Sequence, residues 1–182
     1  MSPVLRATLL AAGLLLALAA PAAADHIPGQ PCNGCASHAA WPSIDGVFHK
    51  ANGAGATFRG TARNDELLGH HGSDVLSGRG GSDVLWGDHD GTGQPTTQRD
   101  RIYGGGGTDF IYGSHGRNVI HAGAGNDVIS VHYGRGIVDC GPGRDIYHVA
   151  RKRRSKYRFR NCERVDYRSE RQRGGRGLRP LR

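Results

Sequence analysis

A nine-residue period constrains the fold of this 182-residue chain more than any other feature. Between Gly60 and His148, each unit opens with glycine-rich residues, usually carries Asp at its sixth position, and ends in three mostly apolar residues. Two adjacent copies, Gly69–Ser77 and Gly78–Trp86, show the pattern clearly. The eighth position is apolar or aromatic throughout, as Leu67, Leu76, Leu85, Ile102, Ile111, Ile120, Ile129, Val138 and Tyr147.

The composition also favours a repeat fold over a conventional globular one. Glycine makes up 30 of the 182 residues, roughly twice its usual share of about 7%. Each glycine in a helix interior costs about 1 kcal/mol, so long helices are not expected. A strict Gly-X-Y period is missing, which excludes collagen, and Leu, Ile, Val and Phe are too sparse for a conventional core.

The period predicts a specific geometry. Glycine allows positive φ, so six residues can turn tightly, and three residues then form a short strand whose middle side chain points inward. Two units complete one coil, and coils stack about 4.8 Å apart as parallel strands, each stable only against its neighbours. We therefore expect an all-β fold: a right-handed parallel β-roll, a β-helix-like solenoid, of about nine units. Short β caps should close both ends, around a core made of a single ladder of eighth-position side chains.

The unit matches the nonapeptide G-G-x-G-x-D-x-U-x, where U is a large apolar residue, of calcium-binding β-rolls. Residues 60–148 thus resemble the hemolysin-type (RTX) calcium-binding repeats of secreted bacterial proteins. The resemblance implies that turn carbonyls and Asp carboxylates of adjacent turns bind Ca²⁺, a hard cation that takes oxygen ligands. The implied ligands are Asp65, Asp74, Asp83, Asp100, Asp109, Asp127, Asp145, Gly78, Gly80, Gly104, Gly106, Gly123 and Asn126.

Because one coil takes two units, alternate units place their turns on opposite sides of the roll. The odd turns belong to the units that start at Gly60, Gly78, Gly104, Ala122 and Cys140, and the sixth residue of each is Asp. The even turns belong to the units that start at Gly69, Gly87, Gly113 and Val131; their sixth residues are Asp74, Asp100, Asn118 and Gly136. We expect Ca²⁺ mainly between odd turns, at up to about four sites, and on the even side at most near Asp74 and Asp100.

The even turns carry a second set of polar residues. Their early positions hold His70, His71, His89, His115 and His132, with Tyr133 beside the last. Such a column could bind a transition metal or respond to pH, or it could consist of ordinary polar turn residues. The unit starting at Gly87 also carries an insertion at about 88–99. This segment is expected to be an exposed loop, serving recognition or representing tolerated extra length.

The N-terminus has the layout of a secretory signal. Met1–Ala24 combines Arg6, an apolar stretch and small residues, which predicts cleavage after Ala24 and an extracellular mature protein. A membrane anchor is the alternative, but the apolar stretch is short for a span. Secretion and an even number of cysteines favour disulfides. The expected pairs are Cys32 with Cys35 and Cys140 with Cys162, with connectivity open and redox or metal use the alternative for Cys32 and Cys35.

The remaining segments are interpreted as caps and a tail. Residues 25–59 form an N-terminal segment whose cap is a hairpin of Ile44–Phe48 and Ala56–Arg59, and residues 149–167 form a C-terminal cap with a hairpin. The net charge of +8 divides into +1 for residues 1–24, −4 for 25–150 and +11 for 151–182. Residues 168–182 should be a disordered basic tail. It either binds anionic lipid, wall polymer or nucleic acid without base specificity, or is merely solvated.

The sequence favours a binding protein over an enzyme. It contains no nucleophile–base pattern, no His-Glu-x-x-His motif and no phosphate loop, and Gly104–Gly107 belongs to the repeat. We expect a monomeric, secreted, non-enzymatic calcium-binding protein whose repeats fold as Ca²⁺ binds outside the cell. The alternatives are a cell-surface adhesin or structural protein with the roll as a spacer and the basic tail as the anionic-surface binder, and, less directly, a small enzyme built on the even-side histidines.

Overall fold

The chain forms two parallel β-sheets that alternate along the sequence. The computed structural model describes residues 40–90, 93, 95–168, 172 and 179–181. One sheet has seven strands: β1 (Phe48–Lys50), β3 (Glu66–Leu68), β5 (Val84–Trp86), β7 (Phe110–Tyr112), β9 (Val128–Ser130), β11 (Ile146–His148) and β13 (Arg164–Asp166). The other has six: β2 (Thr57–Arg59), β4 (Val75–Gly80), β6 (Arg99–Gly106), β8 (Arg117–Ala124), β10 (Arg135–Asp139) and β12 (Tyr157–Arg160).

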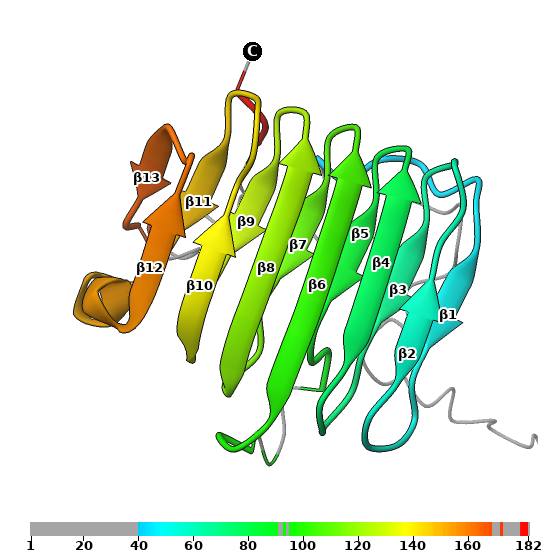
Figure 1. Ribbon diagram of the computed structural model, residues 1–182, viewed down its shortest axis with the longest axis horizontal. Helices are drawn as coiled ribbons and strands as arrows, with labels where there is room; N and C mark the ends of the chain where they lie inside the picture. Colours follow the sequence, from blue (N-terminus) through cyan, green and yellow to red (C-terminus); the bar gives the residue numbers. More distant parts are fainter. Residues whose placement is uncertain (1–39, 91–92, 94, 169–171, 173–178, 182) are drawn as a thin grey trace, which may run out of the picture.

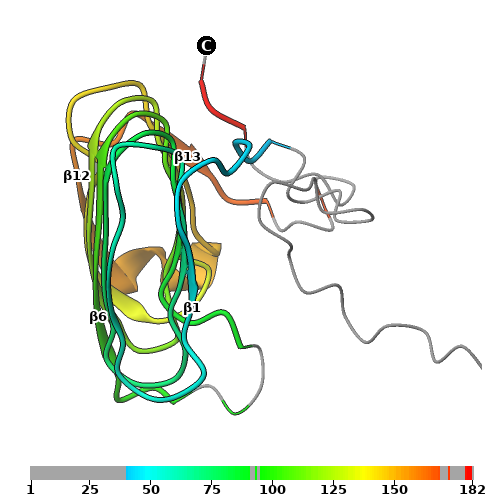
Figure 2. The same cartoon turned by 90° about the vertical axis from the view of Figure 1, so that its right-hand side faces the viewer.

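The two sheets are the long sides of a flattened coil. Figure 1 shows the strands stacked side by side, and Figure 2 shows the successive coils superimposed when viewed along the stack. The prediction of an all-β parallel solenoid is therefore confirmed, with about six turns; the count of nine nonapeptide units stays a prediction. Between β11 and β12 the chain forms η2 (Arg151–Lys156), a 3-10 helix.

The strand register follows the sequence period. In the seven-stranded sheet Leu67 pairs with Leu85, 18 residues later, as two nonapeptides require. The next pair, Leu85 with Ile111, is separated by 26 residues, because the eight-residue insertion lies between them. The insertion therefore leaves the stacking intact and lengthens only one turn.

The interior contains the predicted ladder. The eighth-position side chains from Leu67 to Val138 are all fully buried, and Tyr147 is 6% exposed. They form one cluster, joined at its end by Val149 and Tyr157.

The expectation of a single ladder was wrong, because a second apolar row is also buried. The seventh-position residues Val84, Phe110, Val128 and Ile146 form a separate cluster with Ile44. Seventh-position side chains point to the face opposite the eighth, and the segment before β1 packs there. Its Trp41 indole donates a hydrogen bond of 2.8 Å to the Tyr112 hydroxyl of β7. The covering segment thus protects apolar side chains that would otherwise face water.

The predicted terminal hairpins were also wrong. β1 and β2 lie in different sheets, paired in parallel with β3 and β4. At the other end, β11 and β12 also lie in different sheets, and β12 pairs in parallel with β10. Alternating side chains suit either arrangement, but only the parallel one satisfies the backbone groups of the exposed coil edges. The caps are therefore further coils of the solenoid.

Several predicted segments lie outside the described residues. These are the signal peptide at 1–24, the Cys32–Cys35 pair, and most of the basic tail at 168–182. Among the residues that the structure describes, no helix has the length and apolar character needed to cross a membrane.

Candidate functional site

The odd turns gather five aspartates in one column. These turns connect the six-stranded sheet to the seven-stranded sheet and follow one another along the upper edge in Figure 1. Each carries its Asp directly before a strand of the seven-stranded sheet, so parallel pairing stacks the carboxylates. All five are fully buried. We call this set the Asp column: Asp65, Asp83, Asp109, Asp127 and Asp145.

A hydrogen-bond ladder runs through the Asp column. The backbone N–H of each Asp donates to the Oδ1 atom of the next, for example Asp65 to Asp83 and Asp83 to Asp109, both at 2.8 Å. The same bond joins Asp109 to Asp127 at 2.9 Å and Asp127 to Asp145 at 2.8 Å. One oxygen of each carboxylate after Asp65 is thus used to hold neighbouring coils together.

The second carboxylate oxygen, Oδ2, is left without a partner in most of the Asp column. The Oδ2 atoms of Asp83, Asp109, Asp127 and Asp145 are buried and have no hydrogen-bond partner in the structure. A buried charge without a partner costs several kcal/mol, so each of these four oxygens needs either a cation or a proton. Asp65 differs, because the backbone N–H of Thr61 donates to its Oδ2 at 2.6 Å.

The electrostatics of the Asp column agree with its geometry. Burial raises the pKa of Asp109 to about 8, against the pull of its backbone hydrogen bond and with added repulsion from Asp127 and Asp83. Burial likewise raises the pKa of Asp83 and Asp145 to about 7 and that of Asp127 to about 6. These carboxyls resist ionising unless positive charge is close by.

The predicted turn glycines either leave space beside the unpartnered oxygens or provide an unusual backbone conformation. A Cβ atom on Gly78 would lie 2.1 Å from Asp83 Oδ2, and one on Gly104 would lie 2.3 Å from Asp109 Oδ2. A side chain there would occupy the space beside the unpartnered oxygens. Gly123 has a φ of 112°, a left-handed conformation that favours glycine.

Three other predicted ligands have a looser or different role. Gly80 and Gly106 pair with each other between β4 and β6, and a Cβ atom on either would find no atom closer than 3.8 Å. The Asn126 side-chain oxygen accepts the backbone N–H of Arg144 at 3.0 Å. The Asn126 side chain therefore stabilises the stacking of two turns.

The even side has buried carboxylates at two levels, with Asp100 Oδ2 also lacking a hydrogen-bond partner, and neutral groups at the next level. Asp74 and Asp100 repeat the ladder, since the Asp74 N–H donates to Asp100 Oδ1 at 2.9 Å. At the next level, the Asn118 amide donates to the Tyr157 hydroxyl at 2.9 Å, and that hydroxyl donates to the Tyr133 carbonyl at 2.7 Å.

Tyr157 can reach this position because of the strand register. It lies opposite Gly136, which has no side chain. A neutral phenol and amide therefore stand where the odd side has two carboxylates.

The even-side histidines do not form one column. His70 lies against His71 and His89, with ring centroids 4.5 and 5.5 Å away. His115 instead stacks on Tyr133 at 4.1 Å, and His132 stacks on His148 at 5.1 Å. The long turn between β5 and β6 carries His89 and lies, in the stacking order, between the turn of His70 and His71 and the turn of His115.

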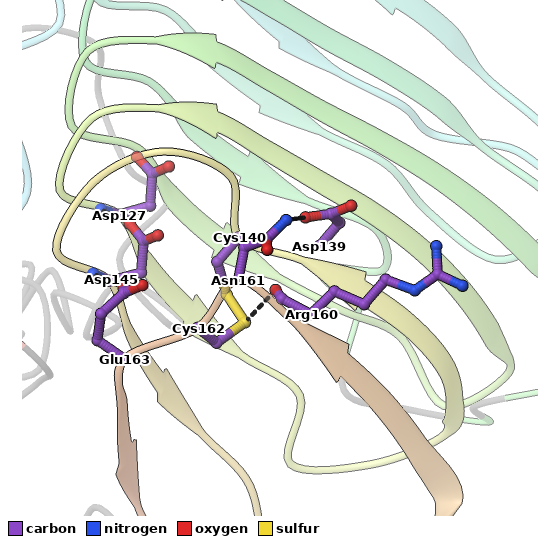
Figure 3. The surroundings of a disulfide bond; sticks show 8 residues. All are labelled: Asp127, Asp139, Cys140, Asp145, Arg160, Asn161, Cys162 and Glu163. Carbon is purple, nitrogen blue, oxygen red and sulfur yellow. Dashed lines mark hydrogen bonds between the residues drawn. A yellow bond between two sulfur atoms is a disulfide. The ribbon is translucent and has the colours of Figure 1, made fainter.

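The C-terminal end of the Asp column contains a ligand candidate that the sequence analysis missed. The Asp145 N–H donates to Glu163 Oε2 at 2.7 Å, so Glu163 takes the position of a sixth member (Figure 3). The adjacent Cys162 forms the predicted disulfide with Cys140. The nonapeptide pattern has ended by then, but Glu163 follows Asp145 by 18 residues, the length of one coil. That spacing was the available signal.

Comparison with known proteins agrees with this geometry. The family model of the RTX calcium-binding nonapeptide repeat matches residues 52–88 and 96–129, in four copies. These residues belong to the RTX calcium-binding repeats. The RTX match contains Asp65, Asp83, Asp109 and Asp127, and the gap in it falls inside the insertion. No curated protein and no solved structure matches the chain.

The residues present fit the ion that RTX repeats bind. Ca²⁺ takes carboxylate and carbonyl oxygens in flexible geometries, and the Asp column offers four buried oxygens that have no other partner. The parallel solenoid is thus consistent with a β-roll, and residues 52–88 and 96–129 of it match calcium-binding repeats.

Proposed function

We propose that this protein is a secreted, non-enzymatic calcium-binding protein that holds Ca²⁺ between stacked odd turns and folds outside the cell as the ion binds. One observation carries the proposal: four consecutive buried carboxylates in the Asp column each leave one oxygen without a partner. The match to the RTX calcium-binding repeats supports Ca²⁺ as the cation, and the signal-like segment Met1–Ala24 supports secretion.

The coupling of binding to folding follows from the free-energy cost of burying the carboxylates of the Asp column. Each coil is stable only against its neighbours, and stacking brings the carboxylates into a buried row. Without a cation, stacking must either bury unpaired charge or protonate the carboxyls. With Ca²⁺ the same oxygens become ligands, so the binding free energy contributes directly to folding. A cytoplasm poor in Ca²⁺ would leave the chain unfolded for export.

The odd side and the even side should differ in ion binding. Asn118 and Tyr157 satisfy each other on the even side, so no carboxylate remains there beyond Asp74 and Asp100 among the even sixth positions. We expect most bound Ca²⁺ along the odd turns. A structure determined with Ca²⁺ present, showing ions in equal numbers on both sides, would contradict this distribution.

The first test removes one charge from the middle of the Asp column. Asp109→Asn keeps the shape of the side chain and the Oδ1 acceptor, but removes the anionic oxygen. We expect fewer Ca²⁺ ions bound per chain by calorimetry. At free Ca²⁺ of about 100 times the dissociation constant, each lost site should lower the free energy of unfolding by about 3 kcal/mol. In Ca²⁺-free buffer the variant should be at least as stable as the wild type, because it has one buried unpaired carboxyl fewer.

Asp139→Asn is the matched control. Asp139 lies outside the Asp column, and its carboxylate accepts a hydrogen bond from Asn161 at 2.8 Å. This variant should bind as many ions as the wild type. Equal effects of the two substitutions on Ca²⁺ binding would refute the assignment. A circular dichroism spectrum unchanged by Ca²⁺ would refute the coupling to folding while leaving the binding sites intact.

A further inference from the structure

The insertion brings two carboxylates back onto the first even turn. His70 and His71 occupy that turn, and Asp88 and Asp90 follow β5 at the start of the long connection to β6, which loops out at the lower end of the solenoid (Figure 2). The expected exposed loop is therefore folded inward at both of its ends, since Asp88 and Gln98 are only 5% and 4% exposed.

The side chains of His70, His71 and Asp90 lie at distances from one another that are close to those between the ligands of a metal ion. His70 Nε2 lies 3.4 Å from Asp90 Oδ2, and His71 Nε2 lies 3.8 Å from the same oxygen. One donor atom from each residue lies within 4.8 Å of the other two. Tetrahedral Zn²⁺ with bonds of about 2.0–2.1 Å requires ligand atoms about 3.3–3.4 Å apart. The side chains therefore need to move only slightly to enclose an ion.

The surrounding contacts hold one imidazole in a ligating orientation. His71 Nδ1 lies 3.1 Å from Asp88 Oδ2, and the Asp88 side chain is fully buried. Because a carboxylate only accepts hydrogen bonds, this contact places the proton on Nδ1 and leaves the Nε2 lone pair directed at Asp90. A carboxylate behind a histidine is the usual outer partner of a histidine ligand to zinc.

Further hydrogen bonds fix that buried carboxylate. Gln98 Nε2 donates to Asp88 Oδ2 at 3.1 Å, and the Asp90 N–H donates to Asp88 Oδ1 at 3.2 Å. Gln98 in turn accepts the backbone N–H of Gly72 at 3.1 Å, which ties the insertion to the turn that carries the histidines. Both ends of the insertion thus support the cluster, which extra length without a role would not explain.

We propose that His70, His71 and Asp90 bind one transition-metal dication of the Zn²⁺ class, with Asp88 orienting His71. Two imidazole nitrogens and one carboxylate suit Zn²⁺ rather than Ca²⁺, which takes oxygen ligands. Three protein ligands leave a fourth position to water or to another ligand. The site lies on the even side and is independent of the Asp column.

The test titrates the purified protein with Zn²⁺ by calorimetry in saturating Ca²⁺, which keeps the Asp column occupied. We expect the double variant His70→Gln/His71→Gln to bind one Zn²⁺ fewer per chain than the wild type. His121→Gln is the matched control, because His121 is exposed on β8 and stacks on Tyr103; it should bind Zn²⁺ as the wild type does. Co²⁺ in place of Zn²⁺ should give a tetrahedral visible spectrum in the wild type and in His121→Gln, but not in the double variant.

A second variant tests the role of Asp88 separately. Asp88→Asn should weaken Zn²⁺ binding about 10- to 100-fold without removing a ligand. Circular dichroism and the Ca²⁺ content of each variant show whether the β-roll is intact, so failure of this site is distinguishable from failure of the calcium proposal. Wild-type Zn²⁺ stoichiometry in the folded double variant, or no Zn²⁺ binding by the wild type, would overturn the proposal.

Discussion

At the scale of single residues, the sixth position decides what each turn can do. On the odd side it is always Asp, and four of the five leave a buried oxygen without a partner. On the even side Asn118 replaces the acid, and its amide finds the Tyr157 hydroxyl. The change from carboxylate to amide thus separates a turn that needs a cation from one that satisfies itself.

Substitution of Tyr157 tests this neutral closure. Tyr157→Phe removes the acceptor of the Asn118 amide and the donor to the Tyr133 carbonyl, which leaves buried polar groups unpaired. We expect a loss of about 1–3 kcal/mol in the free energy of unfolding, measured by urea denaturation in saturating Ca²⁺. Tyr103→Phe is the control and should cost little, because Tyr103 is 38% exposed. A neutral effect of Tyr157→Phe would show that the closure is not needed.

At the scale of elements, strands of three to eight residues become stable by stacking in parallel. The C-terminal coil departs from the repeat, because the strand register places its turn of Asn161, Cys162 and Glu163 opposite the longer segment 140–145 of the preceding coil. The disulfide ties this turn to Cys140, at the start of the preceding odd turn. It thereby holds Glu163 beside Asp145, at the end of the Asp column (Figure 3).

Removal of the disulfide should weaken both the fold and the last ion site. The bond closes a loop of 22 residues, which the chain-entropy model values at about 3 kcal/mol. We expect Cys140→Ser/Cys162→Ser to lower the free energy of unfolding by about that amount and to reduce Ca²⁺ binding at the C-terminal end. Thermal denaturation and calorimetry measure the two effects. Unchanged Ca²⁺ binding would show that Glu163 does not depend on the disulfide.

At the scale of the whole molecule, the charge is divided between a basic C-terminal segment and a mildly acidic body. Residues 151–182 carry +11, and residues 25–150 carry −4. Within the acidic body, the five carboxyls of the Asp column are buried rather than exposed to solvent. The response of the protein to pH should therefore be governed by its buried carboxyls, namely the Asp column with Glu66 and Asp100, rather than by the net charge of +8.

The Ca²⁺-free protein should be more stable in mild acid than in mild alkali. Burial raises the pKa of Asp109 to about 8 and that of Asp83 and Asp145 to about 7 in the folded chain, against about 3.9 in an unfolded one. Between about pH 4 and pH 8 the folded state binds more protons, so its stability falls as pH rises. We expect the free energy of unfolding to decrease by at least about 1 kcal/mol from pH 5 to pH 8.

Circular dichroism of dialysed, Ca²⁺-free protein measures this effect, with more β-structure expected at pH 5. Saturating Ca²⁺ should reverse the trend, because the ion and the protons compete for the same oxygens. Greater stability at pH 8 than at pH 5 in the absence of Ca²⁺ would contradict the buried Asp column.

The sequence by itself determined the parallel solenoid, the eighth-position ladder and the alternation of odd and even turns. These features repeat every 9 or 18 residues, so local turn geometry and strand periodicity are enough to predict them. The positions of Asp65 to Asp145 and the Cys140–Cys162 pair followed from the same periodicity and from counting.

Only the tertiary structure decided which polar groups meet across several coils. Tyr157 reaches Asn118 over 39 residues, and Trp41 reaches Tyr112 over 71. No period links these residues. They come together because parallel stacking places distant turns a few ångströms apart, and the chain segments that break the repeat then fold onto the nearest unsatisfied groups.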